Sequence, residues 1–211
     1  AETNMKTFKD LKDNHGVETI VTSCAGCFRA MKKDYSLSDE YEEYLGGIKI
    51  IHTTDFLFEQ FNEGKIKFTK ELDWKVTYHD PCHTGRHLID FDVDEDGSKQ
   101  WKGSYLGKSE DNCLYDIPRE MLKTIPGLDF VEMERIRSNS YCCGGGGGVM
   151  TGYGDWASKN AGLRIQEGMD TGAEHMVSIC PFCHYNLNEG AKKIKSSMKV
   201  YDLVELIDMA L

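Results

Sequence analysis

Residues 175–184 have the sequence His-Met-Val-Ser-Ile-Cys-Pro-Phe-Cys-His, in which a short apolar run leads directly into a C-x-x-C pair. The run is of the length and composition typical of a buried strand, and we predict a strand over 175–179 that ends at Cys180. The residues after Cys183 favour a helix to about residue 195. This order of strand, cysteine pair and helix decides how the rest of the chain is interpreted.

The same order occurs earlier, where Thr22-Ser-Cys-Ala-Gly-Cys-Phe-Arg29 matches Ser178-Ile-Cys-Pro-Phe-Cys-His-Tyr185. In both places a further apolar segment follows, starting near His52 or Val200. An internal repeat of this kind predicts two related domains. We therefore expect residues 1–70 to be the C-terminal part of a first domain, and 71–211 to be a complete second one.

Strands and helices alternate along the chain, which predicts an α/β fold of parallel sheets with crossover helices. In such sheets ligands collect at the carboxyl ends of the strands, and Cys24, Cys82 and Cys180 all follow predicted strands. Residues 90–112 have no clear period and are interpreted as a surface insertion. The strands are expected at 18–23, 48–51, 75–78, 130–133 and 175–179, and the helices at 8–14, 27–34, 54–62, 118–125, 149–169, 183–195 and 201–211.

Composition narrows the class of protein. A chain of 211 residues can bury its own core, and eight cysteines are too sparse for a disulfide-dense secreted scaffold. With no signal peptide and no unbroken apolar span, we expect a cytoplasmic protein that meets the inner membrane face only through a partner. The net charge of −10 argues against nucleic acid as a partner.

Five cysteines in the second half are predicted to converge on one metal centre. Soft thiolates favour zinc, cuprous copper or iron-sulfur clusters, and five are more than one tetrahedral zinc uses. An adjacent pair suits a multi-iron cluster better than a single ion. The glycines that follow the pair, Gly144 and Gly145 first, allow backbone N–H groups to approach an anionic cluster. The five are Cys82, Cys142, Cys143, Cys180 and Cys183.

Other interpretations of the cysteines stay open at this point. The five could be buried structural thiols, as free cysteines often are. Cys24 and Cys27 could be metal ligands without their partners, a zinc half-site, or free thiols. Cys113 is interpreted as incidental. The segment 180–184 also matches haem c attachment and a glutaredoxin-type dithiol, but the first needs export and the second a longer chain.

Histidines and arginines near Cys82 are candidates for substrate chemistry. His79, His83 and His87 could donate protons to a leaving sulfur or only shape the pocket. Arg86 and Arg119 could bind a substrate carboxylate or phosphate. We take His83 and Arg86 as the catalytic candidates. The glycine run lacks the lysine of a P-loop, since Tyr153 stands in its place.

Several motifs together resemble the cysteine-rich CCG domain of heterodisulfide reductase, above all of its D-type subunits and the related B-type ones. The motifs are His79-Asp-Pro-Cys-His-Thr-Gly-Arg86, Tyr115-Asp-Ile-Pro-Arg119, Ile125-Pro-Gly127, Val131-Glu-Met-Glu-Arg135, Cys142-Cys-Gly-Gly-Gly146 and Cys180-Pro-Phe-Cys183. The resemblance covers nearly the whole chain. The spacing between Cys82 and Cys142 is longer than in the family, which the insertion at 90–112 explains.

The resemblance implies that the five cysteines hold a noncubane four-iron four-sulfur cluster. It also implies that Cys24 and Cys27 are the last two ligands of a preceding domain, whose cluster would form only if that upstream domain is supplied. The implied activity is reduction of a disulfide of two small thiol cofactors, of the coenzyme M and coenzyme B type found in methanogenesis. The implied partners are a cytochrome b membrane subunit or a flavin or ferredoxin subunit.

Two other functions use the same residues. The chain could relay electrons in a lactate, glycolate, glycerol-3-phosphate or quinone-linked oxidoreductase, without binding a disulfide. It could also be a zinc-stabilised structural module. A pocket that reaches the metal centre would distinguish catalysis from relay.

Overall fold

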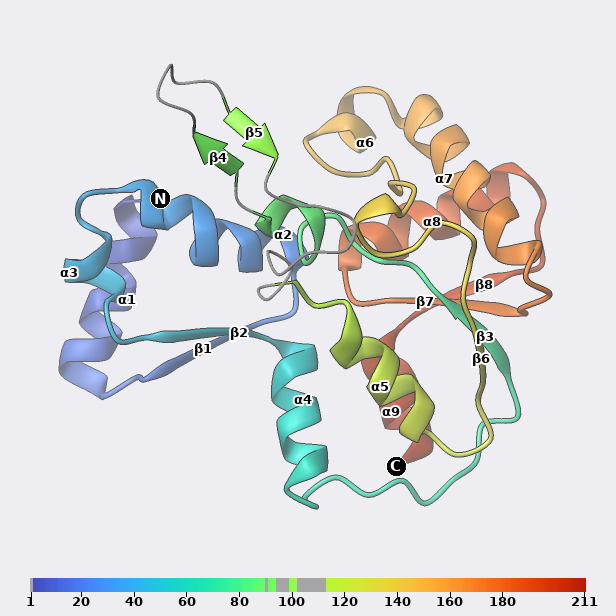
Figure 1. Ribbon diagram of the computed structural model, residues 1–211, viewed down its shortest axis with the longest axis horizontal. Coiled ribbons are helices and arrows are strands. Elements are labelled where there is room, and N and C mark those ends of the chain that lie inside the picture. The colour runs from blue at the N-terminus through green and yellow to red at the C-terminus, as the bar shows by residue number, and fades with distance from the viewer. Residues whose placement is uncertain (1, 90, 94–98, 102–112) are drawn as a thin grey trace.

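A four-stranded parallel sheet organises the second half of the chain in the computed structural model, which describes residues 2–89, 91–93, 99–101 and 113–211 (Figure 1). The strand order is β6-β3-β7-β8, and every pair is parallel. This confirms the α/β class. The strands are β3 (Lys75–Tyr78), β6 (Asp129–Val131), β7 (His175–Ser178) and β8 (Lys199–Asp202).

The strand order places a topological switch point in the middle of this sheet. After β3 the chain crosses to β6 on one side, and it then returns to β7 on the other side. Loops that leave neighbouring strands in opposite directions open a crevice at the carboxyl ends of those strands. The carboxyl ends of β3 and β7 are therefore where the fold itself provides room for a ligand.

Helices cover both faces of the sheet, as Figure 1 shows. On one face α7 and α8 pack together, and their side chains Ile165 and Leu187 meet Met176 of β7. On the other face α5 and α9 contribute Leu122 and Leu206. These helices are α5 (Asp116–Thr124), α7 (Gly154–Met169), α8 (Pro181–Lys193) and α9 (Leu203–Ala210).

The first half repeats part of this architecture. Its two strands pair in parallel, so that Thr22 lies beside His52, just as Ser178 lies beside Asp202 in the second half. His52 and Asp202 each close a capping box at the start of the next helix. The elements are α1 (Glu2–His15), β1 (Thr19–Thr22), α2 (Ala25–Arg29), a π-helical turn (Ala30–Asp34), a 3₁₀ turn (Tyr35–Leu37), α3 (Tyr41–Leu45), β2 (Lys49–His52) and α4 (Thr53–Asn62).

Two predicted helices differ from the structure. The expected helix at 149–169 is divided into α6 (Val149–Gly152) and α7, because Tyr153 between two glycines takes an extended φ of −141°. The expected helix at 201–211 begins only at Leu203, since residues 199–202 form the edge strand β8. Short 3₁₀ turns also form at Arg86–Leu88 and Arg137–Asn139.

Within the predicted insertion at 90–112 the structure describes two short antiparallel strands, β4 (Phe91–Val93) and β5 (Lys99–Trp101). Residues 90, 94–98 and 102–112 lie outside the described part of the chain. Among the described helices, none is both long and apolar enough to cross a bilayer.

Candidate metal centre

The five predicted cysteines come together at the switch point. Cys82 follows β3 and Cys180 follows β7, so these two thiols lie on neighbouring strands. Cys183 lies in the first turn of α8. The adjacent pair is carried by the loop between β6 and α6, and brings Cys143 into the buried cluster that also holds Cys180 and Cys183. All eight cysteines are free thiols.

Thiol–thiol interactions join the five side chains in one unbroken series. The series is Cys82 with Cys142, Cys142 with Cys143, Cys143 with Cys183, and Cys183 with Cys180. Cys143, Cys180 and Cys183 are each less than 5% exposed, whereas Cys142 is exposed to solvent. The arrangement is therefore a buried thiol group with one open end.

Contacts within this series set which thiols ionise. Hydrogen bonds from Cys143 and Cys82 hold the pKa of Cys142 far below its ordinary value. Cys183, followed by backbone N–H groups, lowers the pKa of Cys180 to about 7. The neighbouring Cys142 thiolate raises the pKa of Cys143 to about 12. A cation that binds all five thiols must therefore displace protons from those that stay protonated.

Backbone N–H groups are directed at the sulfurs. The N–H of Gly144 donates to Cys142 Sγ at 3.3 Å, and that of Gly145 donates to Cys143 Sγ at 3.5 Å. Cys180 receives N–H groups from Phe182 and Cys183 at the start of α8. These donors stabilise negative charge on sulfur, as the glycine run led us to expect.

Two asparagines hold the loop of the cysteine pair, and sequence reasoning missed both. Asn160 of α7 donates to the Cys142 carbonyl at 2.7 Å, and the buried Asn186 of α8 donates to the Cys143 carbonyl at 2.6 Å. Asparagine is disfavoured inside helices, so its position in mid-helix was the available signal. Gly144 has a φ of +81°, and a Cβ there would lie 2.7 Å from Asn160 Nδ2.

The first-half pair lies beside this centre. The Ala25 N–H is directed at Cys180, and the Cys24 and Cys27 thiols interact with each other. Neither joins the series of five. Cys113 is separate, because its thiol donates to the Gly85 carbonyl at 3.3 Å.

The catalytic candidates lie at the open end. His83 Nδ1 is 3.7 Å from Cys82 Sγ, and its ring meets that of His87 edge-on, with centroids 4.7 Å apart. Burial lowers the pKa of His83, which favours its neutral form. Arg86 donates to the Ser138 carbonyl at 3.2 Å and borders a cavity at the thiols.

Arg119 corrects one expectation. Instead of being open to a substrate, its guanidinium is 3% exposed and pairs with Asp80 and Glu132 at 2.7 and 2.6 Å. Every nitrogen of the group is used within the protein. Arg119 is therefore a structural residue that fixes the strand end before Cys82.

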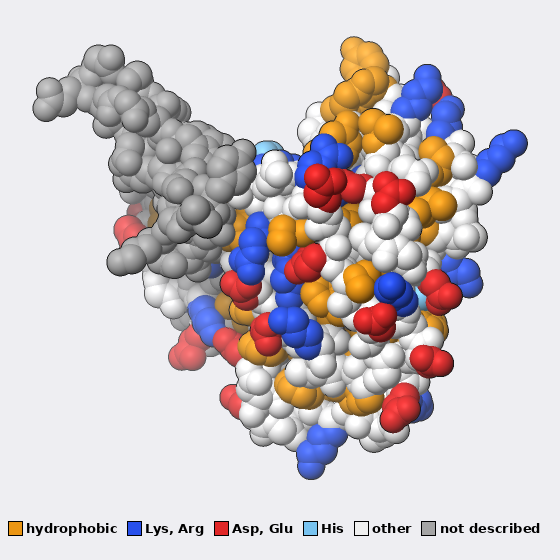
Figure 2. All heavy atoms as spheres, turned by 45° about the vertical axis from the view of Figure 1, so that its right-hand side comes forward, with side chains coloured by type: hydrophobic (Ala, Val, Ile, Leu, Met, Phe, Trp, Pro, Cys, Tyr) orange, Lys and Arg blue, Asp and Glu red, His pale blue; other side chains and the backbone are white. Residues whose placement is uncertain are grey.

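Two hollows adjoin the open end, and both reach Cys82 and Cys142. One, of about 450 Å³, is bordered by the cationic side chains Arg86 and Arg135. The other, of about 460 Å³, is mostly apolar and includes Val149 and Trp156. Trp156 is 58% exposed, and Figure 2 shows hydrophobic side chains projecting at the upper edge of the molecule, the end where Figure 1 places α6. The thiol group is thus accessible to a small molecule with a charged part and an apolar part.

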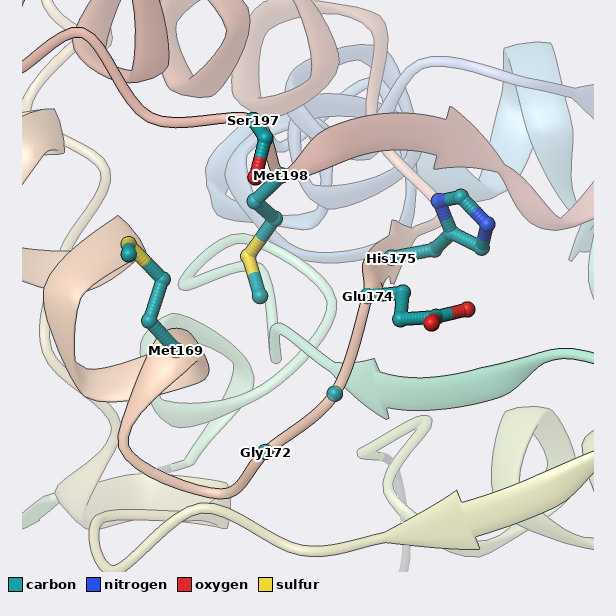
Figure 3. A pocket seen from close by; sticks show the side chains of 7 residues that line it. Met169, Gly172, Glu174, His175, Ser197 and Met198 are labelled. Carbon is teal, nitrogen blue, oxygen red and sulfur yellow. The ribbon is translucent and has the colours of Figure 1, made fainter.

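A third hollow, of about 360 Å³, lies at the opposite, amino ends of β7 and β8. Met169 and Met198 border it, while the ring of His175 turns away from both (Figure 3). That ring packs against Trp74, with centroids 4.3 Å apart. Position and lining separate this hollow from the cysteine centre.

The fold and the thiols define a class: an α/β protein that gathers soft metal ligands at a topological switch point. The chain belongs to the CCG family, whose cysteine-rich domain model matches residues 76–188. This confirms the resemblance that the motifs indicate. The match contains all five cysteines of the centre.

Curated relatives cover almost the whole chain. The D-type subunit of the dihydromethanophenazine:CoB--CoM heterodisulfide reductase of Methanosarcina acetivorans is 37% identical over 93% of this chain and 41% of its own length. The B-type subunit of the fumarate reductase (CoM/CoB) of Methanothermobacter marburgensis is 32% identical over 92% and 33%. The probable iron-sulfur-binding oxidoreductase FadF of Bacillus subtilis is 31% identical over 98% and 25%. The chain thus spans about two fifths or less of these relatives.

Proposed function

We propose that this chain is an iron-sulfur module of a heterodisulfide reductase-like oxidoreductase, and that its five convergent cysteines hold one noncubane four-iron four-sulfur cluster. The observation that carries the proposal is the unbroken series of five thiols from Cys82 to Cys180 at the switch point. The relatives support it, since they include subunits of reductases and an iron-sulfur-binding oxidoreductase.

The donor set fits an iron-sulfur cluster better than a zinc ion or a structural core. A structural zinc uses four ligands, while five thiols here share one group. Buried thiols that served only as apolar filling would need no N–H groups directed at them, yet Gly144 and Gly145 supply such groups. Hydrogen bonds of this kind are typical of cluster sulfurs, whose negative charge they stabilise.

We further propose that the module reduces a disulfide of two small thiols, in which two electrons and two protons convert one disulfide to two thiols. When bound, the cluster would supply electrons delivered by a redox partner. The chain itself offers an opening for the substrate, because both hollows reach Cys82 and Cys142. This access favours catalysis over pure electron relay.

Specific side chains are suited to the remaining tasks. Arg86 and Arg135 border the cationic hollow and would bind an anionic end of the disulfide. Trp156 borders the apolar hollow and would cover an alkyl segment. His83, beside Cys82, is placed to pass a proton to a sulfur as it leaves.

The two-domain arrangement belongs to the same proposal. Residues 1–70 would be the end of a first CCG domain, and 71–211 a complete second one. The matching positions of His52 and Asp202, each an N-cap after a parallel strand, support the repeat. In this arrangement Cys24 and Cys27 would face a second cluster, and Ala25 would contact Cys180 from across the domain boundary.

The test is the iron content of anaerobically purified protein. We expect about four irons per chain, held through thiolates, with visible absorption that a zinc protein lacks. Cys143→Ala should lower the iron content, while Cys113→Ala should leave it unchanged, since that thiol bonds to Gly85 instead. Equal iron loss in both variants, or stoichiometric zinc in the wild type, would reject the proposed centre.

A further inference from the structure

His79 is a buried histidine directly behind the cysteine centre. It follows the last residue of β3 and is 1% exposed. One of its ring nitrogens and the Sγ atoms of Cys143 and Cys183 all lie within 4.8 Å of one another. By distance alone the ring could be either a metal ligand or a hydrogen-bond donor to sulfur.

A contact with Arg164 decides between these roles. Arg164 Nε donates to His79 Nδ1 at 3.1 Å. Because a guanidinium stays protonated and has no acceptor atom, Nδ1 must carry a lone pair. The proton of the neutral ring is therefore on Nε2. A nitrogen that carries a proton has no lone pair for a metal, so the ring is a donor.

Arg164 is itself held so that it cannot release this tautomer. Its side chain is fully buried, and Nη1 donates to the Arg135 carbonyl at 2.9 Å and to Glu167 at 2.6 Å. Nη2 donates to Ser140 Oγ at 3.1 Å. With both terminal nitrogens engaged, the Nε–H keeps its direction toward the histidine.

The Nε2–H of His79 is a donor awaiting an acceptor. Among the described residues it is buried without a hydrogen-bond partner. A buried donor left unpaired costs about 1–3 kcal/mol, so such groups normally face something that accepts. The nearby thiols of Cys143 and Cys183 mark where sulfur of a bound cluster would lie.

We propose that His79 is a positioning residue that donates one fixed hydrogen bond to the cluster, in a tautomer set by Arg164, and thereby raises the cluster's reduction potential. Reduction adds negative charge to the cluster, and an N–H donor stabilises the more negative state. The inference rests on the proposed function, because it needs a cluster among the five cysteines.

Redox titration followed by electron paramagnetic resonance tests the effect on potential. His79→Leu removes the donor, and its midpoint potential should be more negative than that of the wild type. His79→Gln places an amide N–H near the position of Nε2 and should restore most of the shift. An unchanged potential in His79→Leu, at equal iron content, would overturn the inference.

Two measurements on the wild type avoid any folding defect of the variants. In the iron-free protein, long-range ¹H–¹⁵N spectra should show His79 protonated at Nε2, and a ring protonated at Nδ1 would overturn the assignment. In the loaded protein with ¹⁵N-histidine, hyperfine couplings should be weak, whereas a strong coupling would make His79 a ligand. Wild-type protein that binds no iron would reject the proposed function instead.

Discussion

The guanidinium of Arg119 forms a two-pronged ion pair with the carboxylate of Asp80, with N to O distances of 2.7 and 2.9 Å. Asp80 is 2% exposed and also accepts the N–H of Arg137. The pair ties α5 to the end of β3, two residues before Cys82. A buried pair of this kind holds the strand end in register with the loop that carries the adjacent cysteines.

Breaking this pair should destabilise the protein strongly. Arg119→Met leaves the Asp80 carboxylate buried and uncompensated, and we expect a loss of about 3–5 kcal/mol in the free energy of unfolding. Denaturant unfolding measures it. Lys123→Met, on the same helix but in an exposed pair with Glu120, is the control and should change stability by less than about 1 kcal/mol.

The double variant Arg119→Met with Asp80→Asn separates pairing from packing. If the loss comes from an unpaired charge, the double variant should be more stable than the sum of the two single losses implies. Strict additivity would show that Arg119 acts through its packing against Tyr78 instead, over whose ring its guanidinium lies at 5.0 Å.

Gly144 should tolerate no side chain. Its φ of +81° is strained for alanine by about 1–2 kcal/mol, and the new Cβ would press on Asn160. Because Asn160 holds the Cys142 carbonyl, Gly144→Ala is expected to displace the cysteine pair and to lower iron content. Gly152→Ala, where a Cβ meets nothing within 4 Å, is the matched control. Equal iron in both variants would contradict the role given to the loop.

His52 should make stability fall in mild acid. Burial lowers its pKa from 6.5 to about 4 in the folded protein. Between these values the unfolded chain binds the proton more readily, so stability is full above pH 6.5 and is lost as the pH falls to about 4. The shift corresponds to at most about 3 kcal/mol. Unfolding by urea at several pH values measures it.

His52→Asn is the informative variant, since asparagine keeps an acceptor for the Thr54 N–H at this N-cap but does not titrate. We expect it to reduce the loss of stability between pH 6.5 and 4. An unchanged pH dependence would place the titration at other buried histidines.

The sequence was sufficient to predict the parallel α/β class and the family. Strand ends could be predicted because each short apolar run stops at a cysteine, and parallel topology brings such ends to one edge. The strand order could not be predicted. It depends on which strand returns beside β3, and this order makes the switch point that places Cys82 beside Cys180.

The supporting residues of the site were harder to predict. Arg164 lies on a helix face among Ala161 and Ile165, a position that suggests packing until its contacts are seen. The edge strand β8 has only four residues and leads directly into α9, so its apolar residues merge with the helical pattern. Tertiary contacts, not local pattern, decide both cases.

The cationic hollow gives the last prediction, which concerns substrate charge. Arg86 borders this hollow beside Cys82 and Cys142, and a charge-assisted hydrogen bond to an anion is worth about 1.5–3 kcal/mol. Arg86→Gln should therefore weaken binding of bis(2-sulfonatoethyl) disulfide to the iron-loaded chain about 10- to 100-fold. The neutral bis(2-hydroxyethyl) disulfide should bind both forms alike, because it has no anionic group for the arginine to meet. Arg137→Gln, whose arginine pairs with Asp116 away from the hollow, is the control in calorimetry. Equal weakening for both disulfides would mean that Arg86 shapes the hollow without selecting charge, and the anionic class of substrate would then be rejected.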